Sequence, residues 1–152
     1  MQILKAELKD YEDIVSMTKT YALTSPYKEL VDVRAVELIT KEFLVEDKKI
    51  IFYVKNDGVP VGFLAGAALP FILGLDTIAT EIAWWVDPEF RANGVGSLLL
   101  YAFEEWARTT GCAIISLSSM DAGVGEIYIK KGYKLQEYTY TKMVTCPQQP
   151  QQ

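Results

Sequence analysis

Apolar and polar positions follow two different spacings along this chain, and the spacings separate strands from helices. Runs of β-branched and aromatic residues bounded by turn residues indicate strands, and apolar residues three to four positions apart indicate helices. Asp10 and Asp32 stand where helices are expected to begin, and Gly111 and Gly132 where helices are expected to end. We expect strands at residues 2–8, 50–54, 61–69, 77–86, 112–117 and 133–144, and helices after Asp10, after Asp32, and at 95–111 and 124–131.

The elements follow one another without internal repeats and without a linker. The turn at residues 56–58 is expected to join two strands, and Pro70 is expected to end the second of them. This order predicts a single α/β domain over residues 1–145. Residues 146–152 carry no core-forming side chains, so we expect them to form a flexible tail.

Composition narrows the classes of protein that the chain could belong to. Its 152 residues are half apolar, which suits one domain with a proper core and excludes general disorder. The net charge of −5 makes nucleic acid a poor partner and suits a cationic acceptor better. Residues 59–75 are uncharged, but they are too short for a membrane span and are interrupted by proline and glycine.

The cysteine and histidine content favours a reducing compartment and chemistry without a metal. Histidine is absent, and Cys112 and Cys146 are the only cysteines, so neither a disulfide framework nor a metal site is expected. With no secretory signal at the N-terminus, the cytoplasm is the expected location. Cys112 has no histidine to activate it, which disfavours it as a nucleophile.

The segment 91–96, Arg-Ala-Asn-Gly-Val-Gly, lies between the strand at 77–86 and the helix at 95–111. A glycine-bearing turn into a helix leaves backbone N–H groups unpaired beside the positive end of the helix dipole, which favours a phosphate-bearing ligand. A P-loop would need a lysine after Gly96, and a dinucleotide site would need a third glycine. The alternative is that the two glycines only let a turn close tightly.

Three elements in order resemble the GNAT superfamily of N-acetyltransferases. They are Arg-x-x-Gly-x-Gly at 91–96, the hairpin at 58–63, and Tyr128 followed by Gly132 and Tyr133, where the family has Tyr-x-x-x-Gly-Phe. The resemblance implies a mixed, mostly antiparallel sheet of about six to seven strands flanked by about four helices. It also implies acetyl-CoA as the cosubstrate.

By the same resemblance, the pyrophosphate of acetyl-CoA would lie on the 91–96 turn, and its pantetheine arm would pair with the strand before it. The backbone N–H near Val86 would then face the thioester carbonyl. In the position of Asp121 the family often has Asn, and Lys131 could add positive charge. The residues expected to bind acetyl-CoA are Trp84, Trp85, Val86, Arg91, Ala92, Asn93, Gly94, Val95, Gly96, Ser97, Asp121 and Lys131.

Two residues are candidates for proton transfer. Glu81 is a carboxylate on an otherwise apolar strand, where alternation would place it on one face with Ala83 and Trp85. It is a candidate general base, and the alternative is a structural or exposed acid. Tyr128 is by resemblance a candidate general acid for the leaving thiolate, and the alternative is a packing residue among nine tyrosines.

The sequence says least about the pocket that would hold the acceptor. Aromatic residues could surround a cationic amine, line the core or form a dimer interface, which the apolar segment 70–75 also favours. We therefore expect transfer of an acetyl group to a primary amine of a small molecule or peptide, by direct attack in a ternary complex. A non-catalytic acyl-CoA-binding module, a toxin-like acetyltransferase acting on aminoacyl-tRNA and an unrelated scaffold are the alternatives, and no membrane partner is expected. The aromatic candidates are Tyr21, Tyr27, Phe71, Trp84 and Trp85.

Overall fold

The structure is a computed structural model that describes residues 1–144. The chain forms two compact units, Met1–Ser116 and Leu117–Gln152, and each is described by itself. That they make one domain over residues 1–145 stays a prediction. The expected flexible tail at 146–152 lies outside the described residues.

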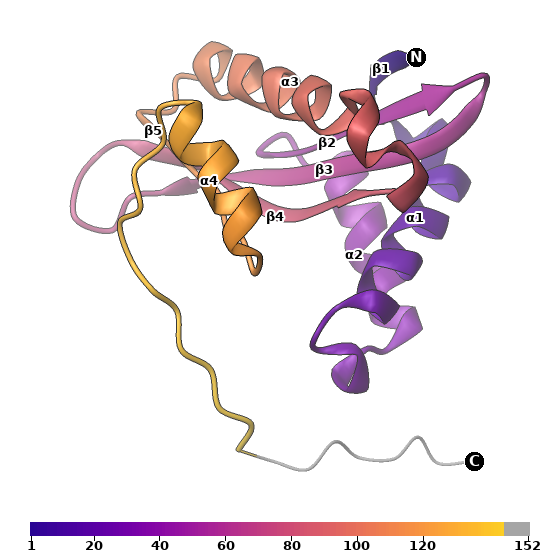
Figure 1. Ribbon diagram of the computed structural model, residues 1–152, viewed down its shortest axis with the longest axis horizontal. Coiled ribbons are helices and arrows are strands. Elements are labelled where there is room, and N and C mark those ends of the chain that lie inside the picture. The colour runs from indigo at the N-terminus through magenta and orange to yellow at the C-terminus, as the bar shows by residue number, and fades with distance from the viewer. Residues whose placement is uncertain (145–152) are drawn as a thin grey trace. The chain divides into compact units, whose positions relative to one another are not determined.

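The first unit is built on a five-stranded sheet whose strands lie in the order β1-β2-β3-β4-β5 (Figure 1). The first four strands are antiparallel, and β5 runs parallel to β4. The sheet is therefore mixed and mostly antiparallel, as predicted, with fewer strands than the six to seven expected. The strands are β1 (Gln2–Lys5), β2 (Lys49–Asn56), β3 (Val59–Pro70), β4 (Thr77–Val86) and β5 (Ile114–Ser116).

Helices α1 (Tyr11–Thr24) and α2 (Val33–Val45) cover one face of the sheet, and α3 (Val95–Thr109) covers the other (Figure 1). Asp32 caps α2 as predicted, because its carboxylate accepts the Arg34 N–H at 2.8 Å. Asp10 precedes α1 but makes no side-chain cap bond to it. Its carboxylate instead accepts the Glu7 N–H at 2.9 Å and closes the short 3-10 helix η1 (Leu8–Asp10).

The core on the α1 side joins Ile14 and Met17 of α1 to Ile51, Tyr53 and Phe63 of the sheet, all of them buried. Burial of these side chains removes apolar surface from water and fixes α1 on the sheet.

On the other face, a glycine sets the distance between α3 and β3. A Cβ at Gly66 would lie 2.3 Å from Cε2 of Phe103, so only glycine lets α3 approach this closely.

Two connections between strands match the sequence pattern. Asp57 and Gly58 have positive φ angles of 49° and 83°, as a tight β2–β3 turn requires. Between β3 and β4, a loop is closed by the Phe71 N–H, which donates to the Asp76 carbonyl at 2.9 Å. At the tip of this loop, Ile72 and Leu73 are exposed.

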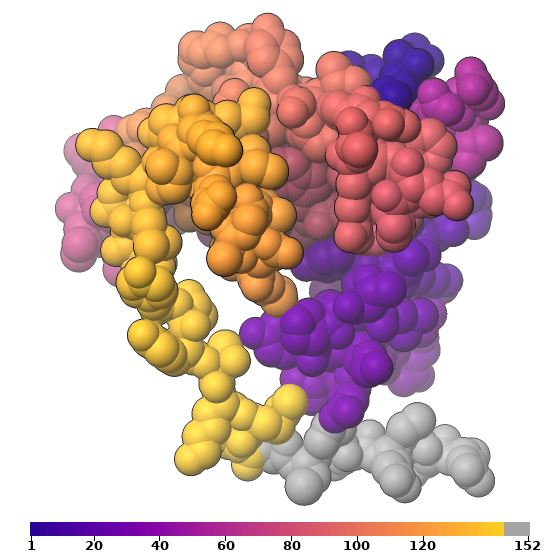
Figure 2. Space-filling model, viewed as in Figure 1, coloured from indigo at the N-terminus to yellow at the C-terminus, as the bar shows by residue number. Residues whose placement is uncertain are grey.

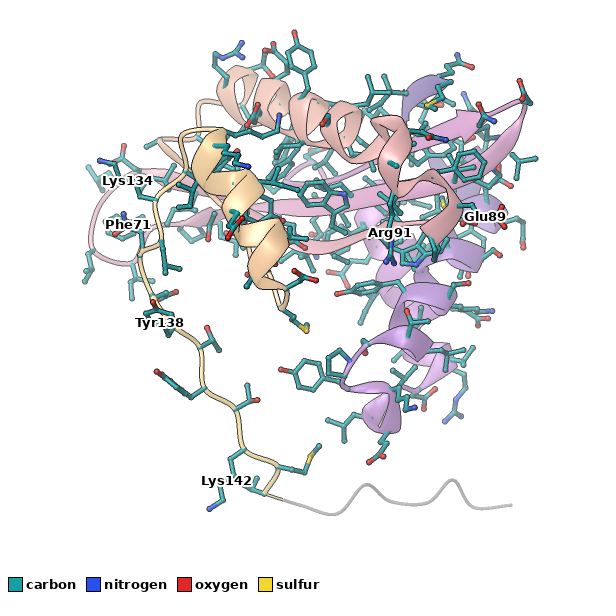
Figure 3. All side chains as sticks on the ribbon, viewed as in Figure 1. Phe71, Glu89, Arg91, Lys134, Tyr138 and Lys142 are labelled. Atoms are coloured by element: carbon teal, nitrogen blue, oxygen red, sulfur yellow. The ribbon has the colours of Figure 1, made fainter. Side chains whose placement is uncertain are left out.

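The second unit contains helix α4 (Ala122–Lys130), whose cap is Asp121. Gly132 follows the helix with a φ of 92°, the left-handed conformation predicted for it. The strand expected at residues 133–144 is wrong for this structure, because these residues form neither helix nor strand. They run as an extended segment along which the side chains of Lys134, Tyr138 and Lys142 are labelled (Figure 3). A strand needs a neighbouring strand for its hydrogen bonds, and strand-forming residues alone do not supply one.

Candidate active site

The outer edge of β4 is only partly covered. On one side β4 pairs with β3 along its whole length, and on the other it pairs with β5 only at Ile78, Ala79 and Thr80. No strand in residues 1–144 pairs with the outer edge of β4 beyond Thr80. This part of the strand can therefore accept an extended ligand.

The peptide groups at the end of β4 are oriented for that purpose. The Asp87 N–H donates to the Val61 carbonyl at 2.9 Å, so it points toward β3. Since peptide groups alternate along a strand, the N–H and carbonyl of Val86 point the other way, toward the open edge. That the N–H near Val86 faces a thioester carbonyl stays a prediction.

A β-bulge at Ile82 changes the pattern of β4. Ala65 lies opposite Ala83, but Gly66 lies opposite Glu81, so Ile82 is an extra residue. Because of this bulge, side chains do not alternate strictly between the two faces of the sheet through Ile82. The expectation that Glu81, Ala83 and Trp85 share one face therefore cannot be derived by counting residues along the strand. Bulges are common where a strand must redirect a side chain at a functional site.

Glu81 is electrostatically coupled to helix α1. Burial raises the pKa of the Tyr21 phenol, and the negative charge of Glu81 raises it further. The Tyr21 ring meets Phe63 edge-on, with 6.0 Å between the ring centroids. The structure thus associates Glu81 with Tyr21, one of the aromatic residues expected near the acceptor.

The other aromatic candidates are distributed around the unit. Trp85 packs against the core cluster on the α1 side, and Tyr27 is exposed. Phe71 lies beyond the end of β4 opposite to Val86. Trp84 lies under the start of α3, where its Cζ2 would be 3.6 Å from a Cβ at Gly96.

The first turn of α3 is uncapped. Its N-cap is Gly94, with a φ of 80° and no side-chain hydrogen bond. The first α-helical bond runs from the Leu98 N–H to the Gly94 carbonyl at 3.1 Å, so the N–H groups of Val95, Gly96 and Ser97 have no acceptor within the helix. These donors and the positive end of the helix dipole make a site for an anion.

The two positions of this turn are glycine for different physical reasons. Gly94 needs its left-handed conformation, which an L-residue adopts only with strain. Gly96 has no positive φ, and a Cβ there would make only ordinary contact with Trp84. Nothing in the fold requires glycine at position 96. A phosphate-bearing ligand that approaches the backbone closely would require it. The turn therefore suits an anionic ligand that approaches the backbone closely.

Arg91 links this turn to β4. It lies on the 3-10 helix η3 (Pro88–Asn93), which Asp87 caps by accepting the Glu89 N–H at 3.0 Å. The Arg91 Nε donates to the Val86 carbonyl at 3.2 Å, which holds the guanidinium beside the open edge of β4. Arg91, Ala92 and Asn93 are exposed, and η3 lies on the visible surface of the first unit (Figures 2 and 3).

The remaining predicted site residues belong to the second unit. Tyr128 is buried, its hydroxyl lies 3.4 Å from the Ser118 carbonyl, and its ring lies 6.0 Å from that of Tyr133. Asp121 accepts the N–H groups of Gly123 and Val124, so its carboxylate caps α4. Lys131 follows the helix with an exposed side chain. Their predicted roles beside β4 stay predictions.

Three further observations limit the chemistry. Burial raises the pKa of the Cys112 thiol, which disfavours the reactive thiolate. Residues 1–144 contain no group of three or more acidic, histidine or cysteine side chains placed to hold a metal ion. No helix in the same range is both long and apolar enough to cross a membrane.

The chain has the fold of known acetyltransferases. It matches a probable acetyltransferase with a TM-score of 0.79 and 20% identity, over 96% of this chain and 99% of the other. It also matches AAC(6')-Iy in complex with a bisubstrate analogue, CoA-S-monomethyl-acetylneamine. The TM-score is 0.77 and the identity 20%, over 95% of this chain and 98% of the other. A third match is the ribosomal-protein-alanine N-acetyltransferase of Brucella melitensis biovar Abortus 2308, with a TM-score of 0.71 and 14% identity over 94% and 99%.

The sequence itself identifies the family. Residues 13–128 match the model of the acetyltransferase (GNAT) family, which is most of the chain. A comparison with curated proteins gives no significant match. The family match and the similar structures identify an acyltransferase that uses acetyl-CoA as cosubstrate. The chain belongs to the acetyltransferase (GNAT) family and is an acetyl-CoA-dependent N-acetyltransferase.

Proposed function

We propose that this protein transfers the acetyl group of acetyl-CoA to a primary amine of a small cationic molecule, by direct attack within a ternary complex. The observation that carries the proposal is the uncapped first turn of α3, where Gly96 is a glycine that neither backbone nor packing requires. A turn of this kind binds an anion that approaches the backbone closely.

The first requirement is to hold the donor. The N–H groups of Val95, Gly96 and Ser97 bind the pyrophosphate, and Arg91 adds positive charge beside them. The open edge of β4 holds the pantetheine arm by strand-like hydrogen bonds, and the Val86 N–H donates to the thioester carbonyl. The support for this arrangement is the orientation of the Val86 peptide toward the open edge.

The second requirement is proton transfer. Glu81 accepts a proton from the acceptor ammonium through water, which makes the amine a nucleophile. Its position beside the Ile82 bulge supports this role. Tyr128 donates its hydroxyl proton to the departing thiolate. Its support is the match to the family's tyrosine and the burial of a side chain whose hydroxyl donates to the Ser118 carbonyl at 3.4 Å.

The acceptor class rests on charge and on the similar structures. The chain carries a net charge of −5, and AAC(6')-Iy is described with an aminoglycoside-derived bisubstrate analogue. We place a small polycationic amine first and a peptide amine second, since one similar structure is a ribosomal-protein-alanine N-acetyltransferase. The negative charge of the chain disfavours aminoacyl-tRNA as the acceptor. We also propose a cytoplasmic location. A non-catalytic acyl-CoA-binding module would bind acetyl-CoA without releasing thiol in the presence of any amine.

The test compares the two ends of α3. Gly96→Ala adds a methyl group that the fold can accommodate, so the unfolding free energy should stay level or rise. The same methyl should weaken acetyl-CoA binding on the order of tenfold or more, measured by calorimetry.

Gly111→Ala is the matched control. It adds a methyl group that would have no atom within 4 Å, but at a φ of 79° beyond the other end of the helix. This variant should lose stability by about 1 kcal/mol and keep its affinity for acetyl-CoA. Unchanged acetyl-CoA affinity in Gly96→Ala would remove the first turn of α3 from the binding site.

A further inference from the structure

A small cavity lies in the first unit, at the end of the sheet where β1 ends and β2 begins. Its volume is about 150 Å³, the room of roughly five water molecules. The C-terminal end of α2, Trp106 of α3 and the ends of the two strands form its walls. Trp106 lies about 16 Å along α3 from Val95, so this cavity is separate from the first turn of that helix.

The end of α2 gives the cavity a wall that favours a cation. The last bond of the helix runs from the Glu46 N–H to the Glu42 carbonyl at 3.1 Å, so the three carbonyls that follow have no donor within the helix. They belong to Phe43, Leu44 and Val45, which all line the cavity. Unpaired carbonyls at the negative end of a helix dipole attract positive charge.

Asp47 adds a negative charge that the fold does not use. Its carboxylate is exposed, lines the cavity and makes no hydrogen bond or ion pair within residues 1–144. The neighbouring Glu46 is different, because it pairs with Lys49 at 3.2 Å, and Lys49 also pairs with Glu42. A carboxylate just beyond the C-terminus of a helix is repelled by the helix dipole, so an ammonium group bound there relieves the repulsion.

Strand β1 supplies a positive charge in the same condition. Lys5 is exposed and lines the cavity, and its ammonium has no hydrogen bond or ion pair in the part of the chain that the structure describes. Trp106 provides a fixed wall, because its ring stacks on the buried Phe103 with 5.5 Å between the ring centroids. The cavity therefore offers one cation and one anion to a ligand, together with a rigid aromatic surface.

We propose that this cavity binds a small aliphatic α-amino acid in its zwitterionic form. The ligand ammonium lies between the Asp47 carboxylate and the carbonyl end of α2, and the ligand carboxylate is bound by the Lys5 ammonium. A simple inorganic ion suits the cavity less well, because it leaves one of these two charges without a partner. The proposal does not depend on the acetyl-transfer chemistry.

The first experiment measures binding to the full chain by calorimetry, with glycine, L-alanine and L-valine as probes. At least one of them should bind with a dissociation constant on the order of 1 mM or lower. For valine the matched analogues are isobutylamine, which lacks the carboxylate, and 3-methylbutanoate, which lacks the ammonium. Each analogue should bind about tenfold more weakly or worse than valine. No binding of any of the three amino acids, or equal affinity for valine and either analogue, overturns the proposal.

The second experiment locates the bound amino acid. Lys5→Gln and Asp47→Asn should each weaken its binding about tenfold or more, because each removes one of the two charges. Both side chains are exposed, so the variants should fold, and the Tm of Asp47→Asn should stay level or rise. Lys48→Gln is the matched control, since Lys48 is exposed but does not line the cavity, and its affinity should equal that of the parent.

The same variants can contradict the proposal. An amino acid bound at the acceptor site would be insensitive to both changes, so parental affinity in Lys5→Gln and Asp47→Asn overturns the assignment to this cavity. An equal loss in Lys48→Gln overturns it as well, because the effect would then follow from the net charge of the chain.

Discussion

At the scale of single residues, the charge of Glu81 and its neighbourhood carry the proposed chemistry. Its carboxylate raises the pKa of the Tyr21 phenol, so the two groups interact across the first unit. A base and an ammonium-binding residue would both need a carboxylate here. The two roles differ in which kinetic constant they affect.

Glu81→Gln distinguishes these roles. If Glu81 is the base, kcat should fall roughly 10²-fold at neutral pH with a high-pKa amine, while acetyl-CoA affinity stays. The deficit should narrow as pH rises, because the amine then loses its proton without help. The measurement is a pH profile of thiol release for the parent and the variant. A raised KM with kcat intact would instead assign Glu81 to binding, and full activity would remove it from the mechanism.

Some features of the candidate site could be predicted from the sequence, and others could not. The spacing of Gly94 and Gly96 between a strand and a helix was sufficient to predict a glycine turn followed by an uncapped helix start, and that an anion binds there stays a prediction. The Ile82 bulge was not predictable, because it depends on how β3 and β4 align and not on the residues of β4 alone. Nor could the Arg91 bond to Val86 be found by spacing, since the path of η3 brings them together.

At the scale of elements, the position of α3 on β3 decides where its first turn lies. The close approach at Gly66 fixes one contact between them, and Phe103 fills the space that a Cβ would need. Any side chain at position 66 must push α3 outward or displace this ring.

Gly66→Ala should therefore lower the unfolding free energy by about 1–3 kcal/mol, measured by urea denaturation. Phe103→Ala alone should cost about 3–5 kcal/mol, because it leaves a cavity. The double variant should cost less than the sum of the two, since each change relieves the other. Additive losses would show that Gly66 and Phe103 do not share this contact.

The elements also show what local pattern can and cannot predict. The four helices and the first five strands lie where the periodicity indicated, with shifts of a few residues at their ends. The strand expected at 133–144 was wrong, although half of its twelve residues are Tyr, Thr or Val. Composition specifies a preference for extended backbone, and the presence of a partner strand decides whether a ladder forms.

At the scale of the whole molecule, the proposed catalytic residues are divided between two units. Glu81 and the first turn of α3 belong to Met1–Ser116, and Tyr128 belongs to the unit that begins at Leu117. Acetyl transfer as proposed requires the Tyr128 hydroxyl as a proton donor.

Tyr128→Phe tests that requirement. It removes only the hydroxyl, so kcat should fall by roughly 10²-fold and the affinity for acetyl-CoA should hardly change. Tyr133→Phe is the control, because it removes the hydroxyl of a tyrosine whose ring is a neighbour of Tyr128. Steady-state kinetics and calorimetry give the two quantities. Equal turnover in the parent and in Tyr128→Phe would mean that the thiolate leaves without this proton donor.

The order of the strands has a consequence for how the sheet opens and closes. Strands β2, β3 and β4 follow one another in sequence and pair through short connections, whereas β5 joins β4 only after α3 and through three residue pairs. Contacts between distant parts of a chain are slower to form, and small edge elements open at a lower free energy than the rest. The amide hydrogens of Ile114 and Ile115 should therefore exchange with deuterium sooner than those of Phe63 and Leu64. Equal protection of the two strands would mean that the sheet opens only as a whole.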